Sequence, residues 1–524
     1  MLPRTLPLRT AVPTLLIAAL GLGVAPAALA MPAAPAPAAP ATAIATTPVG
    51  TGATGATREV LVTGARAAIS QAESLVAHGT GYVPLPVAGG FAASVTGQQR
   101  AQLVALGLHV SSDTAVKVSD ADWGAGSHDA SAVYPQVDGA TAAWARGITG
   151  SGVSVAVVDT GIDNTGDLAG KVIDGYDFSG EGSYTTDSFG HGTFVAGMIA
   201  GSGAASNGAI KGVAPGVNLV SLKVAGADGS SDVVRVIAAI QWAVSHAAVD
   251  HIRVLNLSLG TDSTQSWRID PLDAAVEGAW RAGLVVTVAA GNGGAGAISK
   301  PADDPYVITV GATDDATTPA MSDDAVAPFS ATGPTAAGIA KPDLVAPGTH
   351  VVSTRAPGST VDTTYPSARI DPIYFRGSGT SFSAPQVAGA AALLLQQRPS
   401  LTNNQVKAML TGTADPLSGV PATAQGAGEL DIRSLLNAPA ATGANAGLAS
   451  SDGSGSPLAS EGTLATDGKP QGSDNTAWNS LEWNSLEWNS LEWNSLEWNS
   501  LEWNSLEWNS VGWASMTFWS TEWN

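Results

Sequence analysis

The chain contains no cysteine among its 524 residues. Disulfide bonds, thiolate zinc sites and a cysteine nucleophile are therefore excluded. Basic residues are also scarce, with 23 Lys and Arg against 44 Asp and Glu and a formal net charge of −21. Because proteins bind phosphate backbones through clusters of Lys and Arg, this deficit argues against nucleic acid as a partner.

Long apolar runs are missing as well. Beyond the N-terminal segment no stretch has 18 or more uninterrupted apolar residues, so no transmembrane helix is predicted there. Residues 1–30 are predicted to be a signal peptide. Arg4 and Arg9 give it a positive start, residues 11–24 are a short apolar stretch, and Ala28-Leu29-Ala30 has the small-x-small pattern of a cleavage site. The alternative is an uncleaved membrane anchor. A signal peptide implies export, so we expect an extracellular protein.

Changes in composition divide the rest of the chain into segments. In chain order these are an Ala/Pro-rich linker (31–56), a small α+β unit (57–118), a polar linker suited to processing (119–131), a large α/β unit (132–437), a Gly/Ser-rich linker (438–476) and a Trp-rich repeat tail (477–524).

The α+β unit is predicted from four short patterns. REVLVTG and GGFAASV are typical of strands, whereas AAISQAESLVAHG and GQQRAQLVALG are typical of helices.

The large unit alternates apolar runs with helical stretches. The runs fall at 152–158, 218–224, 252–260 and 283–290, and the clearest helical stretches at 232–247 and 271–283. Near-continuous apolar runs mark strands that are buried on both faces of a parallel sheet. We therefore predict an α/β fold of three layers, with a mostly parallel central sheet and helices on both sides.

The tail repeats every five residues. Six copies of LEWNS run from Leu481 to Ser510, and ten of the 15 tryptophans follow residue 476. A period of five puts the tryptophans on no single face of a helix. One interpretation is a flexible, acidic, low-complexity tail. The other is a retention module whose Trp faces stack on sugars of the cell envelope or on partner aromatics, which would hold the protein at the cell surface.

Three segments carry groups for nucleophilic catalysis. VAVVDTGID contains Asp159 at the end of an apolar strand, GHGTFVAG contains His191, and GTSFSAP contains Ser381 at the start of an apolar helix. A serine hydrolase needs an imidazole to take the serine proton and a carboxylate to orient the imidazole. Each residue alone has a commoner structural role, as a turn residue, a buried histidine or a helix cap. Together they predict a catalytic triad.

These segments resemble the subtilisin family, and the order Asp…His…Ser is that of subtilisin. AAGN (289–292), LNLSLG (255–260) and KPDLVAPG (341–348) extend the resemblance. It implies a secreted serine endopeptidase that cleaves polypeptides, with residues 57–118 as a propeptide that assists folding and then inhibits. We expect no cofactor for catalysis and a monomeric enzyme.

The resemblance also assigns binding residues. Asn292 would donate its side-chain amide to the oxyanion, together with the backbone N–H of Ser381. The residues implied as walls of the primary specificity pocket are Ser258, Leu259, Gly260, Ala289, Ala290 and Gly291. The residues implied as a strand edge for the substrate backbone are Gly229, Ser230 and Ser231.

Three positions differ from the family pattern or match only one part of a family site. Phe382 stands where the family usually has methionine, and Phe194 where it often has a second histidine. Asp167 matches one calcium ligand of the family, which makes structural calcium a candidate. Calcium takes six to eight oxygen ligands, and the sequence identifies only this one.

Two other functions fit the sequence less well than an active protease does. A catalytically retired scaffold that binds through its tail conflicts with the intact set of triad and oxyanion residues. A serine esterase would carry a G-x-S-x-G elbow, which is absent around Ser381.

Overall fold

The computed structural model describes residues 57–76, 81–118, 132–261, 263–448 and 451. The predicted signal peptide, the Ala/Pro-rich linker, the processing linker and the repeat tail lie outside these residues. Within the described ranges, no helix combines the length and the apolarity that a membrane span requires.

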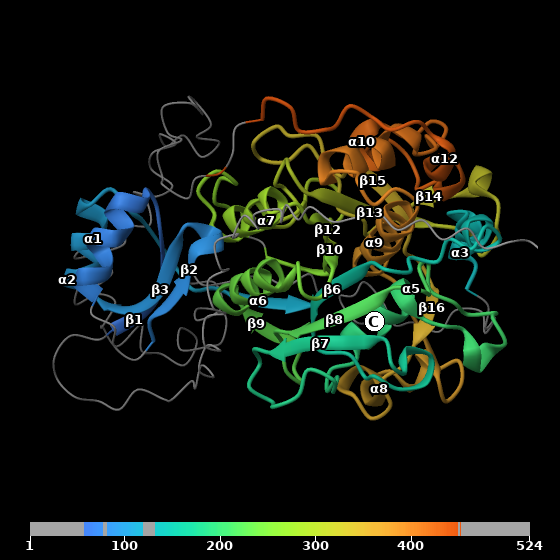
Figure 1. The fold of residues 1–524 in the computed structure, drawn as a ribbon, viewed down its shortest axis with the longest axis horizontal. Helices are drawn as coiled ribbons and strands as arrows, with labels where there is room; N and C mark the ends of the chain where they lie inside the picture. The colour runs from blue at the N-terminus through green and yellow to red at the C-terminus, as the bar shows by residue number, and fades with distance from the viewer. Residues whose placement is uncertain (1–56, 77–80, 119–131, 262, 449–450, 452–524) are drawn as a thin grey trace, which may run out of the picture. The chain divides into compact units, whose positions relative to one another are not determined.

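Residues 57–118 begin with a four-stranded antiparallel sheet of order β2-β3-β1-β4 that packs with two helices (Figure 1). Its elements are β1 (Thr57–Thr63), α1 (Arg66–Val76), β2 (Val83–Leu85), the 3₁₀ turn η1 (Pro86–Ala88), β3 (Gly90–Thr96), α2 (Gly97–Ala105) and β4 (His109–Ser112). The four expected elements are present, whereas β2 and β4 were not predicted. Buried apolar side chains such as Val62, Phe91 and Leu103 form a core of its own.

Two local features explain how β3 and α2 are built. At Gly90 an added Cβ would lie 1.8 Å from the carbonyl oxygen of Val62, so the close approach of β3 to β1 requires glycine. Helix α2 begins with a capping box, in which the Thr96 hydroxyl accepts from the N–H of Gln99 and the Gln99 side chain accepts from the N–H of Thr96.

The large unit is built on an eight-stranded sheet of order β14-β13-β12-β10-β6-β8-β7, with β15 also paired to β13. Every pairing is parallel except that of β13 with β14. The strands are β6 (Ser154–Asp159), β7 (Val172–Asp177), β8 (Asn218–Lys223), β10 (Ile252–Leu257), β12 (Val285–Ala289), β13 (Ile308–Asp314), β14 (Ala325–Val326) and β15 (Leu344–Pro347). The predicted α/β class is confirmed.

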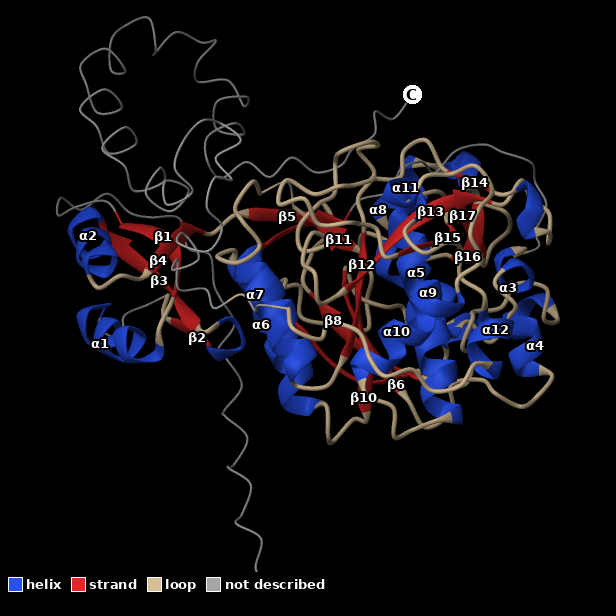
Figure 2. Cartoon of the chain, turned by 90° about the horizontal axis from the view of Figure 1, so that it is seen from above, coloured by secondary structure: helices blue, strands red, loops and turns tan. Residues whose placement is uncertain are grey.

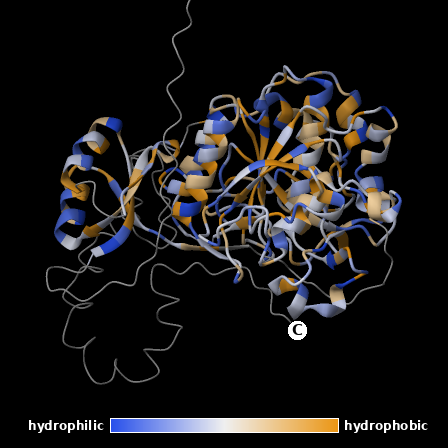
Figure 3. Cartoon of the chain, turned by 60° about the horizontal axis from the view of Figure 1, so that its bottom comes forward, coloured by the Kyte–Doolittle hydropathy of each residue, from blue (hydrophilic) through white to orange (hydrophobic). Residues whose placement is uncertain are grey.

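Helices cover both faces of this sheet (Figure 2). Helices α6 (Val233–His246) and α7 (Pro271–Arg281) lie on one face, and α5 (His191–Ala200), α9 (Thr380–Gln397) and α10 (Asn403–Thr413) lie on the other. The central strands are apolar along their length (Figure 3), and every residue of β6 and β12 is buried. Burial on both faces accounts for the continuous apolar runs in the sequence.

The remaining elements are short. They are β5 (Ala115–Val118), α3 (Tyr134–Val137), α4 (Ala140–Trp144), β9 (Ser230–Asp232), β11 (Leu259–Gly260), β16 (Val351–Thr354), α8 (Thr360–Thr364), β17 (Tyr374–Gly377), α11 (Ala422–Gln425) and α12 (Ile432–Asn437), with the 3₁₀ turns η2 (Gly166–Leu168), η3 (Ala204–Ser206), η4 (Met321–Asp323) and η5 (Pro366–Ala368).

The carboxyl ends of the parallel strands mark the functional edge of the sheet. Strand β6 ends at Asp159, β10 ends at Leu257 and β12 ends at Ala289. Parallel strands bring these ends to one edge, where α/β proteins place their ligands. The predicted triad aspartate and both predicted pocket walls therefore come from neighbouring strands of one edge.

Candidate active site

Asp159 and His191 are in direct contact. Oδ1 of Asp159 lies 2.7 Å from Nδ1 of His191 and also accepts from the N–H of Thr160 over 2.8 Å. Both side chains are buried, with exposed fractions of 1% and 0%. A buried carboxylate at Nδ1 holds the imidazole in the tautomer that carries its basic lone pair on Nε2.

Asp187 supports the helix that begins with His191. Its carboxylate accepts from the N–H of Gly190 and of Thr193, each over 2.7 Å, and from the hydroxyl of Thr160 over 2.8 Å. Burial raises the pKa of Asp187 to about 6, although these donors favour its charged form. Sequence reasoning missed Asp187, because an aspartate four residues before the histidine does not reveal that it caps this helix.

Ser381 lies at the start of α9 and is fully buried. Its hydroxyl lies 3.2 Å from the carbonyl oxygen of Ser258, and the Ser258 hydroxyl donates to the carbonyl oxygen of Ser381 over 2.8 Å. The ring of His191 lies 5.5 Å from that of Phe382, the residue after the serine. Helices α5 and α9 also pack together, so the structure brings the three predicted triad residues to one place.

The two departures from the family pattern are in contact with each other. The rings of Phe194 and Phe382 lie 4.4 Å apart, and both side chains are fully buried. The pair fills the space between α5 and α9 beside the imidazole. The aromatic ring at 194 therefore has a packing partner in the aromatic ring at 382.

Asn292 has a fixed orientation. Its Oδ1 accepts from the N–H and from the hydroxyl of Thr380, each over 2.9 Å, and the side chain is 2% exposed. The same hydroxyl accepts from the N–H of Gly291 over 3.1 Å. Because Thr380 binds the carbonyl end of the amide, the orientation of the side chain, and with it the direction of the amide nitrogen, is fixed. The role of Thr380 was not predicted, since it depends on a contact between residues 88 positions apart.

The two predicted pocket walls meet at Ser299, which sequence reasoning also missed. The Ser299 hydroxyl donates to the carbonyl oxygen of Ala290 over 3.2 Å. A Cβ added at Gly260 would lie 2.7 Å from that hydroxyl, and one added at Gly291 would lie 3.2 Å from it. Glycine at both positions therefore lets the two walls approach the same side chain.

An extended segment of the chain itself occupies the predicted substrate edge. Strand β5 is the middle strand of the sheet β11-β5-β9 and is antiparallel to both neighbours. In the two registers Val116 pairs with Ser231, Lys117 with Ser230 and Gly260, and Val118 with Leu259. The two segments assigned to substrate binding thus flank one extended peptide.

Both carboxylate oxygens of Asp167, the calcium ligand that the resemblance suggests, accept hydrogen bonds within the protein. Its Oδ2 accepts from the hydroxyl of Tyr374 over 2.5 Å, and its Oδ1 accepts from the hydroxyl of Ser202 and the N–H of Ala205, each over 3.0 Å. These donors point hydrogens toward the carboxylate where a cation would need open oxygen lone pairs. Within the described ranges, no group of three or more His, Asp or Glu residues is arranged to hold a metal ion.

Chelation tests this assignment. We expect EDTA to leave the thermal midpoint of the enzyme unchanged, because hydrogen bonds occupy Asp167. The variant Tyr374→Phe should lower the stability by about 1 kcal/mol through loss of its bond to the carboxylate. A midpoint that falls with EDTA and recovers with added calcium would contradict the assignment.

Comparison with known proteins agrees with this geometry. The model of the subtilase family matches residues 150–455. Serine protease AprX of Bacillus subtilis (strain 168) is 42% identical over 296 residues, which cover 55% of this chain and 67% of that protein. Subtilisin Savinase of Lederbergia lenta is 40% identical over 304 residues, which cover 58% of this chain and 95% of that protein.

A solved structure shares the fold. Fervidolysin from Fervidobacterium pennivorans, described as a keratinolytic enzyme related to subtilisin, superposes with a TM-score of 0.58 at 24% identity, over 74% of this chain and 62% of that chain. At this identity the likeness shows the fold alone.

Proposed function

Because the chain belongs to the subtilase family and is a subtilisin-like serine endopeptidase, we propose that it hydrolyses peptide bonds of polypeptides through Asp159, His191 and Ser381. The observation that carries the proposal is the buried contact of 2.7 Å between Asp159 and His191, formed beside the helix whose first turn contains Ser381.

The chemistry follows from these positions. His191 takes the proton of the Ser381 hydroxyl as the oxygen attacks the scissile carbonyl, while Asp159 stabilises the imidazolium that forms. Asn292 and the backbone N–H of Ser381 donate to the oxyanion of the tetrahedral intermediate. His191 then protonates the leaving amine, and water hydrolyses the acyl-enzyme by the reverse sequence. A retired scaffold would have no need for this complete set.

The substrate is held as an added strand. The peptide backbone pairs with Ser230 and Ser231 on one side and with Leu259 and Gly260 on the other, as β5 does. Main-chain hydrogen bonds grip a peptide with little regard to sequence, and side-chain selection falls to the pocket between the two walls.

We further propose that residues 57–118 are a propeptide that inhibits the enzyme by filling this cleft. Three contacts beyond β5 support the proposal. The Val87 N–H donates to the side chain of Gln241 over 3.2 Å, the Asp113 carboxylate accepts from the N–H of Val234 over 3.2 Å, and His109 lies 3.1 Å from Gln265.

Maturation provides the test. N-terminal sequencing of secreted enzyme should give starts between about 118 and 135, because the processing linker follows the strand that fills the cleft. The uncleaved Ser381→Ala protein is the control and should keep the propeptide. Active enzyme that still carries Arg58 near its start would contradict the proposal.

The sequence-based hypotheses on location and partners remain proposals. We propose export through the signal peptide of residues 1–30 and action outside the cell as a monomer. Retention at the cell surface through residues 477–524 is a hypothesis from the repeat alone, since that tail lies outside the described residues.

A further inference from the structure

The backbone of Ala227 is bound from both sides. Its N–H donates to Oε1 of Glu181 over 2.8 Å, and its carbonyl oxygen accepts from the hydroxyl of Thr360 over 2.6 Å. Ala227 lies three residues before Ser230, at the entrance to the strand β9 that pairs with the extended peptide. Glu181 comes from a loop and Thr360 from the start of helix α8, and the two are far apart in the sequence.

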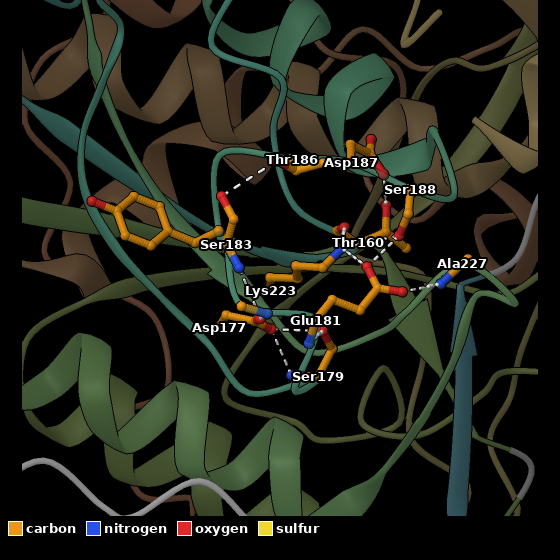
Figure 4. A network of polar contacts seen from close by, with 12 residues as sticks. Thr160, Asp177, Ser179, Glu181, Ser183, Thr186, Asp187, Ser188, Lys223 and Ala227 are labelled. Atoms are coloured by element: carbon orange, nitrogen blue, oxygen red, sulfur yellow. Dashed lines mark hydrogen bonds and ion pairs between the residues drawn. The ribbon is translucent and has the colours of Figure 1, made fainter. Parts of the chain in front are cut away.

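The same two residues also bind Ser188, three positions before His191. The Ser188 hydroxyl donates to Oε2 of Glu181 over 2.5 Å, and its carbonyl oxygen accepts from the N–H of Thr360 over 2.9 Å. Figure 4 shows Glu181 between Ser188 and Ala227. The peptide-pairing edge and the loop that leads to the imidazole are therefore joined by the carboxylate of Glu181 and by the hydroxyl and backbone N–H of Thr360.

A buried lysine favours the negatively charged form of Glu181. Nζ of Lys223 lies 3.2 Å from Oε2 of Glu181, and the exposed fractions of the two side chains are 0% and 35%. Partial burial acts to raise the pKa of Glu181, but the Ser188 hydroxyl, Lys223 and the Ala227 N–H outweigh it, so the pKa lies below its ordinary value. Lys223 pairs in the sheet with Asp159, which places the ion pair beside the triad strand.

Thr360 is held by an ion cluster. It lies in α8, where the buried carboxylate of Asp362 accepts from Arg355, from Arg369 over 2.7 Å and from the N–H of Gly358 over 2.8 Å. Burial acts to raise the pKa of Asp362, but the hydrogen bonds from Arg355, Gly358 and Arg369 lower it to about 2. The Thr360 hydroxyl is thus presented from a rigid support.

We propose that Glu181 and Thr360 are positioning residues for extended peptide substrates, and this rests on the proposed function. They hold Ala227 against Ser188, which sets the distance between the edge that grips the peptide and the imidazole. Leu259 pairs with Val118, and Ser258, the residue before Leu259, contacts Ser381. For a substrate bound in the same register, about the third residue before the scissile bond therefore lies opposite Ser230.

Shorter substrates do not reach this edge. A positioning role should therefore change the kinetics of a long substrate but not those of a short one, whereas a purely structural role would affect both equally. The mature enzyme is assayed on a chromogenic tetrapeptide amide, which covers Ser230, and on an N-acetyl amino-acid ester, which does not. KM and kcat are measured for both, together with the thermal midpoint.

Thr360→Val is the main variant, because it keeps the shape of the side chain and removes the bond to Ala227. Loss of one such bond should raise KM for the tetrapeptide about fivefold and leave the ester kinetics unchanged. Thr363→Val is the matched control, since that hydroxyl in the same helix bonds to the carbonyl oxygens of Ser359 and Thr360 within its own helix. Thr363→Val should leave KM and kcat unchanged for both substrates.

Glu181→Gln is the second variant and keeps the proposal testable if Thr360→Val fails to fold. The amide can still accept from Ala227 but loses the charge opposite Lys223, so KM for the tetrapeptide should rise again. An unchanged tetrapeptide KM, or an equal loss on both substrates, would overturn the proposal. A wild-type enzyme that cleaves the ester but no peptide would instead refute the proposed function.

Discussion

Ser381→Ala should lose on the order of 10⁶-fold in kcat, the magnitude reported for the nucleophile of a subtilisin. Alanine removes the hydroxyl that attacks the scissile carbonyl, and no other residue of the triad can replace it. Digestion of a peptide library by the purified protein measures the loss and gives the cleavage preference of the wild type in the same experiment.

Ser383→Ala is the matched control for this variant. Ser383 lies two residues further along the same helix, and its buried hydroxyl donates to the carbonyl oxygen of Ala346 over 2.9 Å. Its loss should lower the stability by about 1 kcal/mol while leaving kcat near that of the wild type. Full proteolysis by Ser381→Ala would show that Ser381 is not the nucleophile.

The architecture could be predicted because its signals are local. Strands buried on both faces must be apolar throughout, and the run 218–224 corresponds to β8 at Asn218–Lys223. The run 252–260 was harder to interpret, because it contains two strands that break at Ser258. That break turns the chain out of the sheet at the place where it contacts Ser381.

The residues that support the site could not be predicted, because they act through contacts between distant segments. Thr380 orients Asn292, Asp187 caps the helix of His191, and Ser299 joins the two pocket walls. Each is a common polar residue in a loop or helix start. The sequence contains no periodic or compositional signal for such pairings.

Strand β5 illustrates the same limit. AVKV has the composition of a strand, but its partners Ser230 and Gly260 lie more than a hundred residues away. Register between such distant segments depends on the assembled cleft. The family resemblance predicts inhibition by residues 57–118. The pairing of β5 with the two segments assigned to substrate binding would produce such inhibition by occupying the place of a substrate.

The Phe194 and Phe382 pair shows how two departures from a family pattern explain each other. Taken singly, Phe382 is expected from the sequence to remove an oxidation-sensitive thioether and narrow the site, whereas Phe194 has no account there. In the fold the two rings lie 4.4 Å apart in a fully buried position. Replacing one with a smaller side chain would leave the other without its partner, so the two positions are expected to be coupled.

Asn292→Ala should lower kcat by about 10²–10³-fold and leave KM nearly unchanged. The side-chain amide donates to oxygen more strongly when that oxygen carries the charge of the tetrahedral intermediate, so its loss acts on the transition state. Alanine also leaves the N–H and hydroxyl of Thr380 without their acceptor, which should lower the thermal midpoint as well.

A second variant separates these two effects. Asn292→Asp keeps an oxygen for Thr380 but has no amide donor and places a negative charge beside the developing oxyanion. Its kcat should therefore fall at least as far as that of Asn292→Ala, while it avoids the loss of stability that comes from an unsatisfied Thr380. Steady-state kinetics and thermal unfolding of both variants provide the comparison. If Asn292→Asp retained wild-type turnover, or if either change acted on KM alone, the amide would have no part in stabilising the oxyanion, and the donor would have to be sought elsewhere around Ser381.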